Sequence, residues 1–266
     1  MGKKFKNAPV YLTLGQVQHN PLLTLSTYLP EIQERMRKAG YPDFARSIAM
    51  QFIMQPGAEG LSEQAPHANA VERYLFSNMS KTSGFIIQAN SVSFRTSEYD
   101  TFEVFWAELE RGLEILNSAV GGLSFVERLG LRYLDAVVPS EGESINQYLA
   151  AEVLGLPARM PEAIFLHSFS ESVMMAEGIG QVVSRTVIQN GNLGYPPDLP
   201  PDGMKINSRF QAIAGEHAMI DTDGSNTERR AYDIHDIRAR MDDIHKLNAK
   251  CFQATVTDHA RAAWDA

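Results

Sequence analysis

Eight short apolar segments, each bounded by turn residues, run through this sequence and restrict the chain to folds built around a large β-sheet. Runs of this kind predict strands near residues 9–18, 46–55, 72–79, 83–96, 123–138, 163–175, 181–190 and 204–220. Four longer segments predict helices, at residues 24–41, 100–122, 143–155 and 232–252. The second helix carries an apolar stripe that suits packing against a sheet, formed by Phe102, Phe105, Trp106, Leu109, Leu113 and Leu116. The mixture predicts an α+β protein.

The predicted elements follow one order twice, as strand, helix, three strands and helix. The first copy covers residues 1–122 and the second covers residues 123–266. Two such βαβββα halves would form one compact domain, in which a curved antiparallel sheet carries helices on one side, similar to the saddle of the TATA-binding protein. Because unrelated functions share folds, this similarity predicts no function by itself.

The overall charge and the cysteine content narrow the class of protein. The formal net charge is −8 and the pI is about 5.4, which disfavours a dedicated nucleic-acid or anionic-membrane protein because such proteins cluster Lys and Arg. The one cysteine, Cys251, excludes an internal disulfide and a multi-cysteine zinc site, as expected in a reducing compartment. With no apolar stretch of signal-peptide or membrane-spanning length, the sequence predicts a cytoplasmic protein.

Two arginines interrupt the apolar segment "VERLGLRYLDAVV" at residues 126–138. Side chains alternate across a strand, so Arg128, Gly130 and Arg132 share one face while the leucines share the other. The same alternation over residues 204–220 predicts a second polar row with Lys205, Asn207 and Arg209.

Acidic residues gather instead on the predicted helices, so the sheet is expected to have a locally basic face. The predicted ligand-binding residues are Arg128, Gly130, Arg132, Lys205, Asn207 and Arg209. Guanidinium groups suit carboxylates and phosphates, and a glycine lets a partner approach the backbone. Two other interpretations stay open: the arginines keep a solvated face soluble, or they pair with acids in a homodimer packed sheet to sheet.

Catalytic signatures are sparse in this sequence. It contains no Gly-rich phosphate loop, nucleophile elbow, HExxH or CxxC motif, so no cofactor or metal is expected. His167 and Glu171 lie four apart on one predicted strand face and are the best candidates for acid-base catalysis, or for a metal site with His217. The simpler interpretation makes His167 a satisfied histidine on a core face with Phe165 and Phe169.

The segments "APVYLTLGQVQHNPL", "FEVFWAELERGLEIL" with "VERLGLRYLDAVV", and "IHKLNAKCFQATVTDHARAAW" resemble a sporadically distributed family of uncharacterised bacterial proteins of about this length. The most specific part of the resemblance is Arg128 to Asp135, which reads RLGLRYLD. The family has no established activity, so the resemblance implies no mechanism. Its patchy distribution is typical of genes in mobile, defence or biosynthetic clusters.

Together these features favour a non-catalytic binding or adaptor protein that holds an anionic or polar partner on one face of its sheet. A protein, a nucleotide-like ligand and a nucleic acid all fit this hypothesis, although the net charge disfavours the last. A hydrolase, or a subunit of one, that uses His167 and Glu171 is the alternative. The Pro- and Gly-rich stretch at residues 190–203 predicts a long loop, and loops of this length are often functional.

Overall fold

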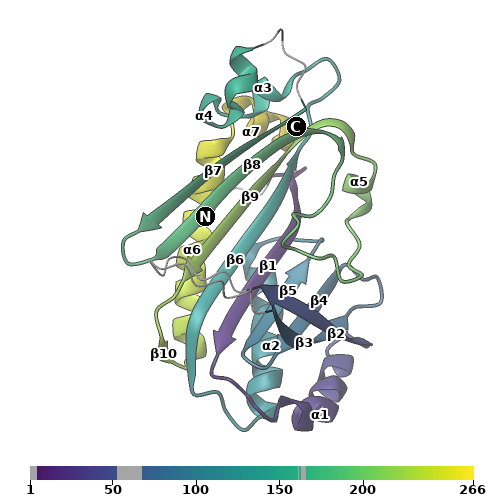
Figure 1. Ribbon diagram of the computed structural model, residues 1–266, viewed down its shortest axis with the longest axis vertical. Helices are drawn as coiled ribbons and strands as arrows, with labels where there is room; N and C mark the ends of the chain where they lie inside the picture. Colours follow the sequence, from purple (N-terminus) through teal and green to yellow (C-terminus); the bar gives the residue numbers. More distant parts are fainter. Residues whose placement is uncertain (1–4, 53–67, 161, 163–165) are drawn as a thin grey trace.

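An open antiparallel sheet forms the centre of the protein (Figure 1). The computed structural model describes residues 5–52, 68–160, 162 and 166–266. The strands are β1 (Val10–His19), β2 (Asp43–Phe52), β3 (Ala68–Ser77), β4 (Ser83–Gln88), β5 (Ser91–Thr96), β6 (Phe125–Val137), β7 (His167–Ala176), β8 (Gly180–Asn192), β9 (Ala214–Asn226) and β10 (Arg230–Ala231). Their order is β2-β3-β4-β5-β1-β6-β9-β8-β7, with β10 beside β6. The strands β2 and β7 therefore lie at the two edges.

The longer helices pack on one side of this sheet, as predicted, whereas a short helix between β8 and β9 lies in a segment over the other side. The helices are α1 (Leu25–Lys38), α2 (Phe102–Ala119), α3 (Ile145–Tyr148), α4 (Ala151–Leu154), the 3-10 turn η1 (Leu156–Arg159), α5 (Ser208–Gln211), α6 (Ile234–Thr255) and α7 (Asp258–Asp265). Figure 1 shows α2 and α6 lying along the sheet, and α5 in the segment that joins β8 to β9. We call the side covered by α2 and α6 the helix face and the opposite side the open face. None of the helices in the described ranges is long and apolar enough to cross a membrane.

Two glycines bring the long helices onto the sheet. A Cβ at Gly15 would lie 2.9 Å from the Phe105 ring of α2, and a Cβ at Gly224 would lie 2.6 Å from Ile244 of α6. Both glycines pair with Leu131 of β6, so α2 and α6 meet the sheet on the two sides of one buried leucine. The predicted apolar stripe of α2 is confirmed, because all six of its residues are buried in the main core. Burial of this apolar surface is the main favourable contribution to folding.

Gly112 packs α2 against the aromatic core and gives a direct test of that packing. Gly112→Ala should destabilise the protein by about 1–3 kcal/mol, because its Cβ would lie 2.2 Å from the ring of Phe85. Helix propensity alone predicts the opposite, a gain of about 1 kcal/mol. Chemical denaturation measures the difference, with Gly194→Ala as the control because no atom lies within 4 Å of its added methyl. A stabilised Gly112→Ala variant would contradict the packing.

The α+β architecture is confirmed, whereas the internal duplication is not. The predicted strand at 83–96 turns at Ala89 and Asn90 and forms the two strands β4 and β5. The first half of the chain thus has four consecutive strands of the sheet after α1, whereas in the second half only β7, β8 and β9 continue the sheet and the short β10 pairs with β6. The helix predicted at 143–155 is also divided, into α3 and α4.

The strand predicted at 204–220 is wrong over its first ten residues. Only β9, from Ala214 onward, is a strand. The preceding residues contain a turn at Asp202 and Gly203 and then α5, which begins where the Asn207 side chain accepts a hydrogen bond from the backbone N–H of Arg209. Asn is a good helix N-cap, so the second part of the alternating stretch, residues 208–211, forms one helical turn that buries Phe210.

Candidate functional site

Arg132 lies on the open face, as the alternation predicted, but it is buried there. Only 8% of its side chain is exposed, and its guanidinium is held between two carboxylates. Its Nε and Nη2 donate to Asp221 of β9 at 2.7 Å each, and its Nη1 donates to Asp198 at 2.6 Å. Alternation therefore places Arg132 away from the leucine face without exposing it to solvent. Its donors are already paired within the chain.

A second group of charges closes the neighbouring part of the open face. Arg73 of β3 and Arg95 of β5 both pair with the carboxylate of Asp202. Asp198 and Asp202 belong to residues 193–213, which join β8 to β9 and which we call the strap. Two aspartates of the strap thus pair with Arg73, Arg95 and Arg132, of which only Arg132 is one of the predicted ligand-binding residues.

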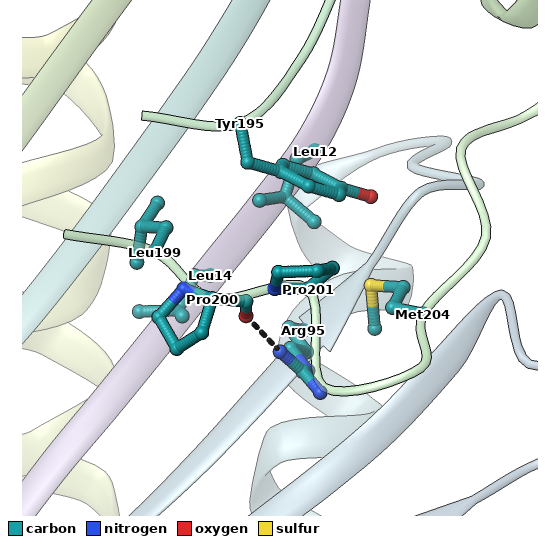
Figure 2. Close-up of a pocket in the computed structure, with 8 residues that line it drawn as sticks. All are labelled: Leu12, Leu14, Arg95, Tyr195, Leu199, Pro200, Pro201 and Met204. Atoms are coloured by element: carbon teal, nitrogen blue, oxygen red, sulfur yellow. Dashed lines mark hydrogen bonds between the residues drawn. The ribbon is translucent and has the colours of Figure 1, made fainter. Parts of the chain in front are cut away.

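The strap is packed as well as charged. Its apolar side chains, including Phe210, pack in a small separate core with Tyr11, Leu12, Leu134 and Ala136. Figure 2 shows Tyr195, Pro200, Pro201 and Met204 over Leu12, Leu14 and Arg95, with Arg95 donating to the carbonyl of Pro200 at 3.2 Å. The cavity between them is about 10 Å³, which is at the lower limit for one water molecule. This part of the face has no room for a ligand.

Arg128 and Gly130 lie beyond the strap on the same face of β6. The half-buried Arg128 donates to Gln16 Oε1 at 3.2 Å. A Cβ at Gly130 would lie 2.8 Å from Arg128 Nη1, so the arginine itself occupies the space above the glycine. The predicted close approach of a partner to Gly130 would require Arg128 to move.

The other three predicted ligand-binding residues are on the strap and contact different parts of the protein. The backbone N–H of Lys205 donates to the carbonyl of Lys81, and Asn207 caps α5. Arg209 donates to the carbonyl of Ala8 and stacks on the ring of Phe210 at 4.3 Å. These residues do not form one row with Arg128 and Arg132, because residues 204–213 are not a strand.

His167 and Glu171 share the open face of β7, as predicted. Glu171 accepts a hydrogen bond from Arg185 Nε at 2.7 Å, and Arg185 also reaches Asp221 at 3.2 Å. Gln189 of β8 lies between His167 and His217 in the strand register. Within the described ranges, no group of three or more His, Cys, Asp or Glu side chains is arranged to hold a metal ion.

The core-face interpretation of His167 is not supported. His167 is exposed, and 58% of Phe169 is exposed, although the third residue of that interpretation, Phe165, lies outside the described residues. Instead, β7 presents exposed apolar side chains on the open face. We call Phe169, Val173 and Met175 the β7 patch; they are 58%, 55% and 75% exposed.

The strand beside it extends this patch. Val187 and Val183 of β8 pair with Phe169 and Val173 and are partly exposed. The ion pair of Glu171 and Arg185 lies between the two apolar pairs. An open hollow of about 480 Å³ adjoins the patch at Met175, Gly178, Ile179 and Glu228. The alternating apolar residues of this patch are visible in the sequence as "FSESVMM". Their exposure follows only from the position of β7 at the edge of the sheet.

Neither protein-family models nor curated proteins give a match to this sequence. The fold defines an α+β protein with an open antiparallel sheet, helices on one face and a packed strap over part of the other.

Proposed function

We propose that this protein is a non-catalytic binding protein whose partner is a polypeptide, held at the β7 edge of the sheet. The observation that carries the proposal is the β7 patch of Phe169, Val173 and Met175. Exposed apolar groups that lie together and are rimmed by polar residues are typical of protein interaction sites.

The charges favour a polypeptide over an anionic ligand. Arg132, which the sequence pattern would offer to an anion, has aspartate partners in the chain, and so do Arg73 and Arg95 on the same side of the sheet. Arg185 at the β7 patch is also paired, with Glu171 and Asp221. The partner would therefore meet an apolar surface that contains a satisfied ion pair.

The edge position of β7 supports recognition by strand addition. β7 pairs with β8 in an unbroken register from His167 to Ala176, and β8 lies on only one of its sides. Edge strands are usually protected by charged side chains, proline or a bulge; β7 contains no lysine, proline or bulge, and its one acidic residue, Glu171, is paired with Arg185. An extended partner segment would bond to the outer edge of β7 and set alternate apolar side chains against the β7 patch.

Phe169→Asp and Val173→Asp should each weaken partner binding at least about 30-fold, because truncating an interface hot spot costs about 2 kcal/mol or more. A photocrosslinking residue at position 173, followed by mass spectrometry, would identify the partner peptide. Surface plasmon resonance with that peptide would then compare the variants. Met174→Asp is the matched control, since Met174 is 44% exposed on the same strand but points to the other face.

Equal binding by all three variants would contradict the proposal. Crosslinks only to residues 167–176 of a second copy would identify the partner as this chain itself.

A further inference from the structure

None of the ten residues of β7 is buried, although the strand belongs to a large sheet. The exposure extends to both faces, because 44% of Met174 is exposed on the helix face in addition to the β7 patch on the open face. Leu166, directly before the strand, is 76% exposed. Unpaired backbone groups along one edge, with apolar side chains on both faces, are the features that favour pairing with a strand of another chain.

The sequence of β7 allows this other strand to be β7 of a second copy. In a two-fold symmetric antiparallel pair, each residue faces a residue of the second copy, and the same pair occurs again on the other side of the axis. Facing residues point to the same face of the sheet, so their numbers have the same parity. The axis therefore passes through one residue, which faces its own copy, and the choice of this residue fixes the register.

Three of the four registers near the middle of β7 give poor matches. A centre at Glu171 would set two Glu171 carboxylates directly opposite each other, and like charges in that position are destabilising. A centre at Ser170 or at Val173 would set the apolar ring of Phe169 opposite an acidic side chain. These three registers are therefore disfavoured.

The fourth register, centred on Ser172, matches side chains of the same kind. Phe169 faces Met175 of the second copy, and an aromatic ring beside a thioether sulfur is a favourable contact. His167 faces Glu177, a carboxylate that accepts a hydrogen bond from a neutral imidazole and pairs with a protonated one. Both of these residues are exposed in the single chain, and two such contacts would form in each dimer.

The open hollow at the end of β7 has a place in the same register. It lies at Met175, Gly178 and Ile179, and Gly178 faces Leu166 of the second copy. The exposed side chain of Leu166 would therefore be covered beside Ile179. Removing this apolar surface from water contributes to association.

We propose that the protein forms a two-fold symmetric homodimer by antiparallel pairing of two β7 strands centred on Ser172, which joins the two sheets into one. This inference rests on the proposed function, since it names a second copy of the chain as the polypeptide held at β7. Glu171 would face Val173 of the second copy and keep its ion pair with Arg185.

Sedimentation velocity over a range of concentrations tests whether the dimer forms. The unmodified protein should reach twice the chain mass of 29.5 kDa as its concentration rises. Phe169→Asp should weaken dimerisation at least about 30-fold, because it replaces an apolar contact at both ends of the pair. Lys250→Glu, an exposed residue of α6, is the control for added negative charge and should dimerise as the unmodified protein does.

An exchange of charges tests the predicted contact between His167 and Glu177. His167→Glu should weaken dimerisation about fivefold, since it sets two carboxylates opposite each other twice in each dimer. Adding Glu177→Lys to that variant should restore the dimer, because a lysine then faces the new carboxylate. Weakening without this restoration would contradict the register.

A single cysteine at the two-fold axis tests the register directly. Cys251→Ser removes the one native cysteine, and Ser172→Cys is then added. Facing Cα atoms of antiparallel strands lie about 4.5–5.5 Å apart, which is within the range of a disulfide, so mild oxidation should link the two copies. Ser170→Cys in the same background is the control, because its two copies would lie four residues apart along the strands, about 13 Å.

The outcomes separate this inference from the proposed function. A monomer at every concentration, with photocrosslinks from position 173 to a different polypeptide, would overturn the homodimer and support the proposed function. A monomer without any crosslink would overturn both. A dimer that persists in Phe169→Asp and forms no disulfide through Ser172→Cys would show that the copies meet elsewhere, and would also overturn the homodimer through β7.

Discussion

Arg132→Ala is expected to reduce the free energy of unfolding by about 3–5 kcal/mol, which is the usual cost of removing one partner from a buried ion pair. The loss arises mainly from the carboxylate left behind. Asp221 is 1% exposed and accepts two hydrogen bonds from Arg132, and Arg185 would supply only one contact at 3.2 Å in their place. Urea denaturation monitored by circular dichroism measures the change.

Arg128→Ala is the matched control for this prediction. Arg128 lies on the same face of the same strand but is half-buried and donates one hydrogen bond, to the neutral Gln16. Its removal should cost about 1 kcal/mol or less. Equal losses in the two variants would show that Asp221 does not depend on Arg132.

Asp202→Ala should have the second large effect, about 3–5 kcal/mol, because one carboxylate serves two buried arginines. Arg73 and Arg95 are each about nine-tenths buried and both pair with Asp202. Their uncompensated charges should also loosen the strap. Limited proteolysis should therefore cut residues 193–213 faster in this variant than in the unmodified protein.

Asp198→Ala distinguishes a buried strap contact from an exposed one. Asp198 pairs with Arg132 but is 62% exposed, so its removal should cost no more than about 1 kcal/mol. Arg132 would keep its two bonds to Asp221. If Asp198→Ala were as damaging as Asp202→Ala, the strap would be held by Asp198 instead.

The fold class could be predicted because it depends on local patterns. Apolar spacing placed α2 and its six buried residues, and alternation placed Arg128 and Arg132 on the face opposite Leu129 and Leu131. The strand predicted at 204–220 failed at its start because the alternation over residues 205–211 is too short to exclude a helical turn, and the cap at Asn207 begins one at residues 208–211. A short periodic stretch of sequence does not distinguish a helix from a strand.

The candidate site depended on contacts between distant parts of the chain. Arg132 meets Asp198 and Asp221, which are 66 and 89 residues away in sequence. No local pattern predicts that the acids which neutralise the sheet lie in a proline-rich loop. The sequence accordingly suggested an anion-binding face that includes Arg132, whereas in the structure Arg132 is paired with Asp198 and Asp221.

The sequence by itself determined the elements, their amphipathic faces and the parity of each strand, because backbone geometry and the burial of apolar side chains act over a few residues. Only the tertiary structure decided which strand became an edge and which arginines were neutralised. Those outcomes depend on strand order and on the path of the strap, and both follow from packing across the whole chain.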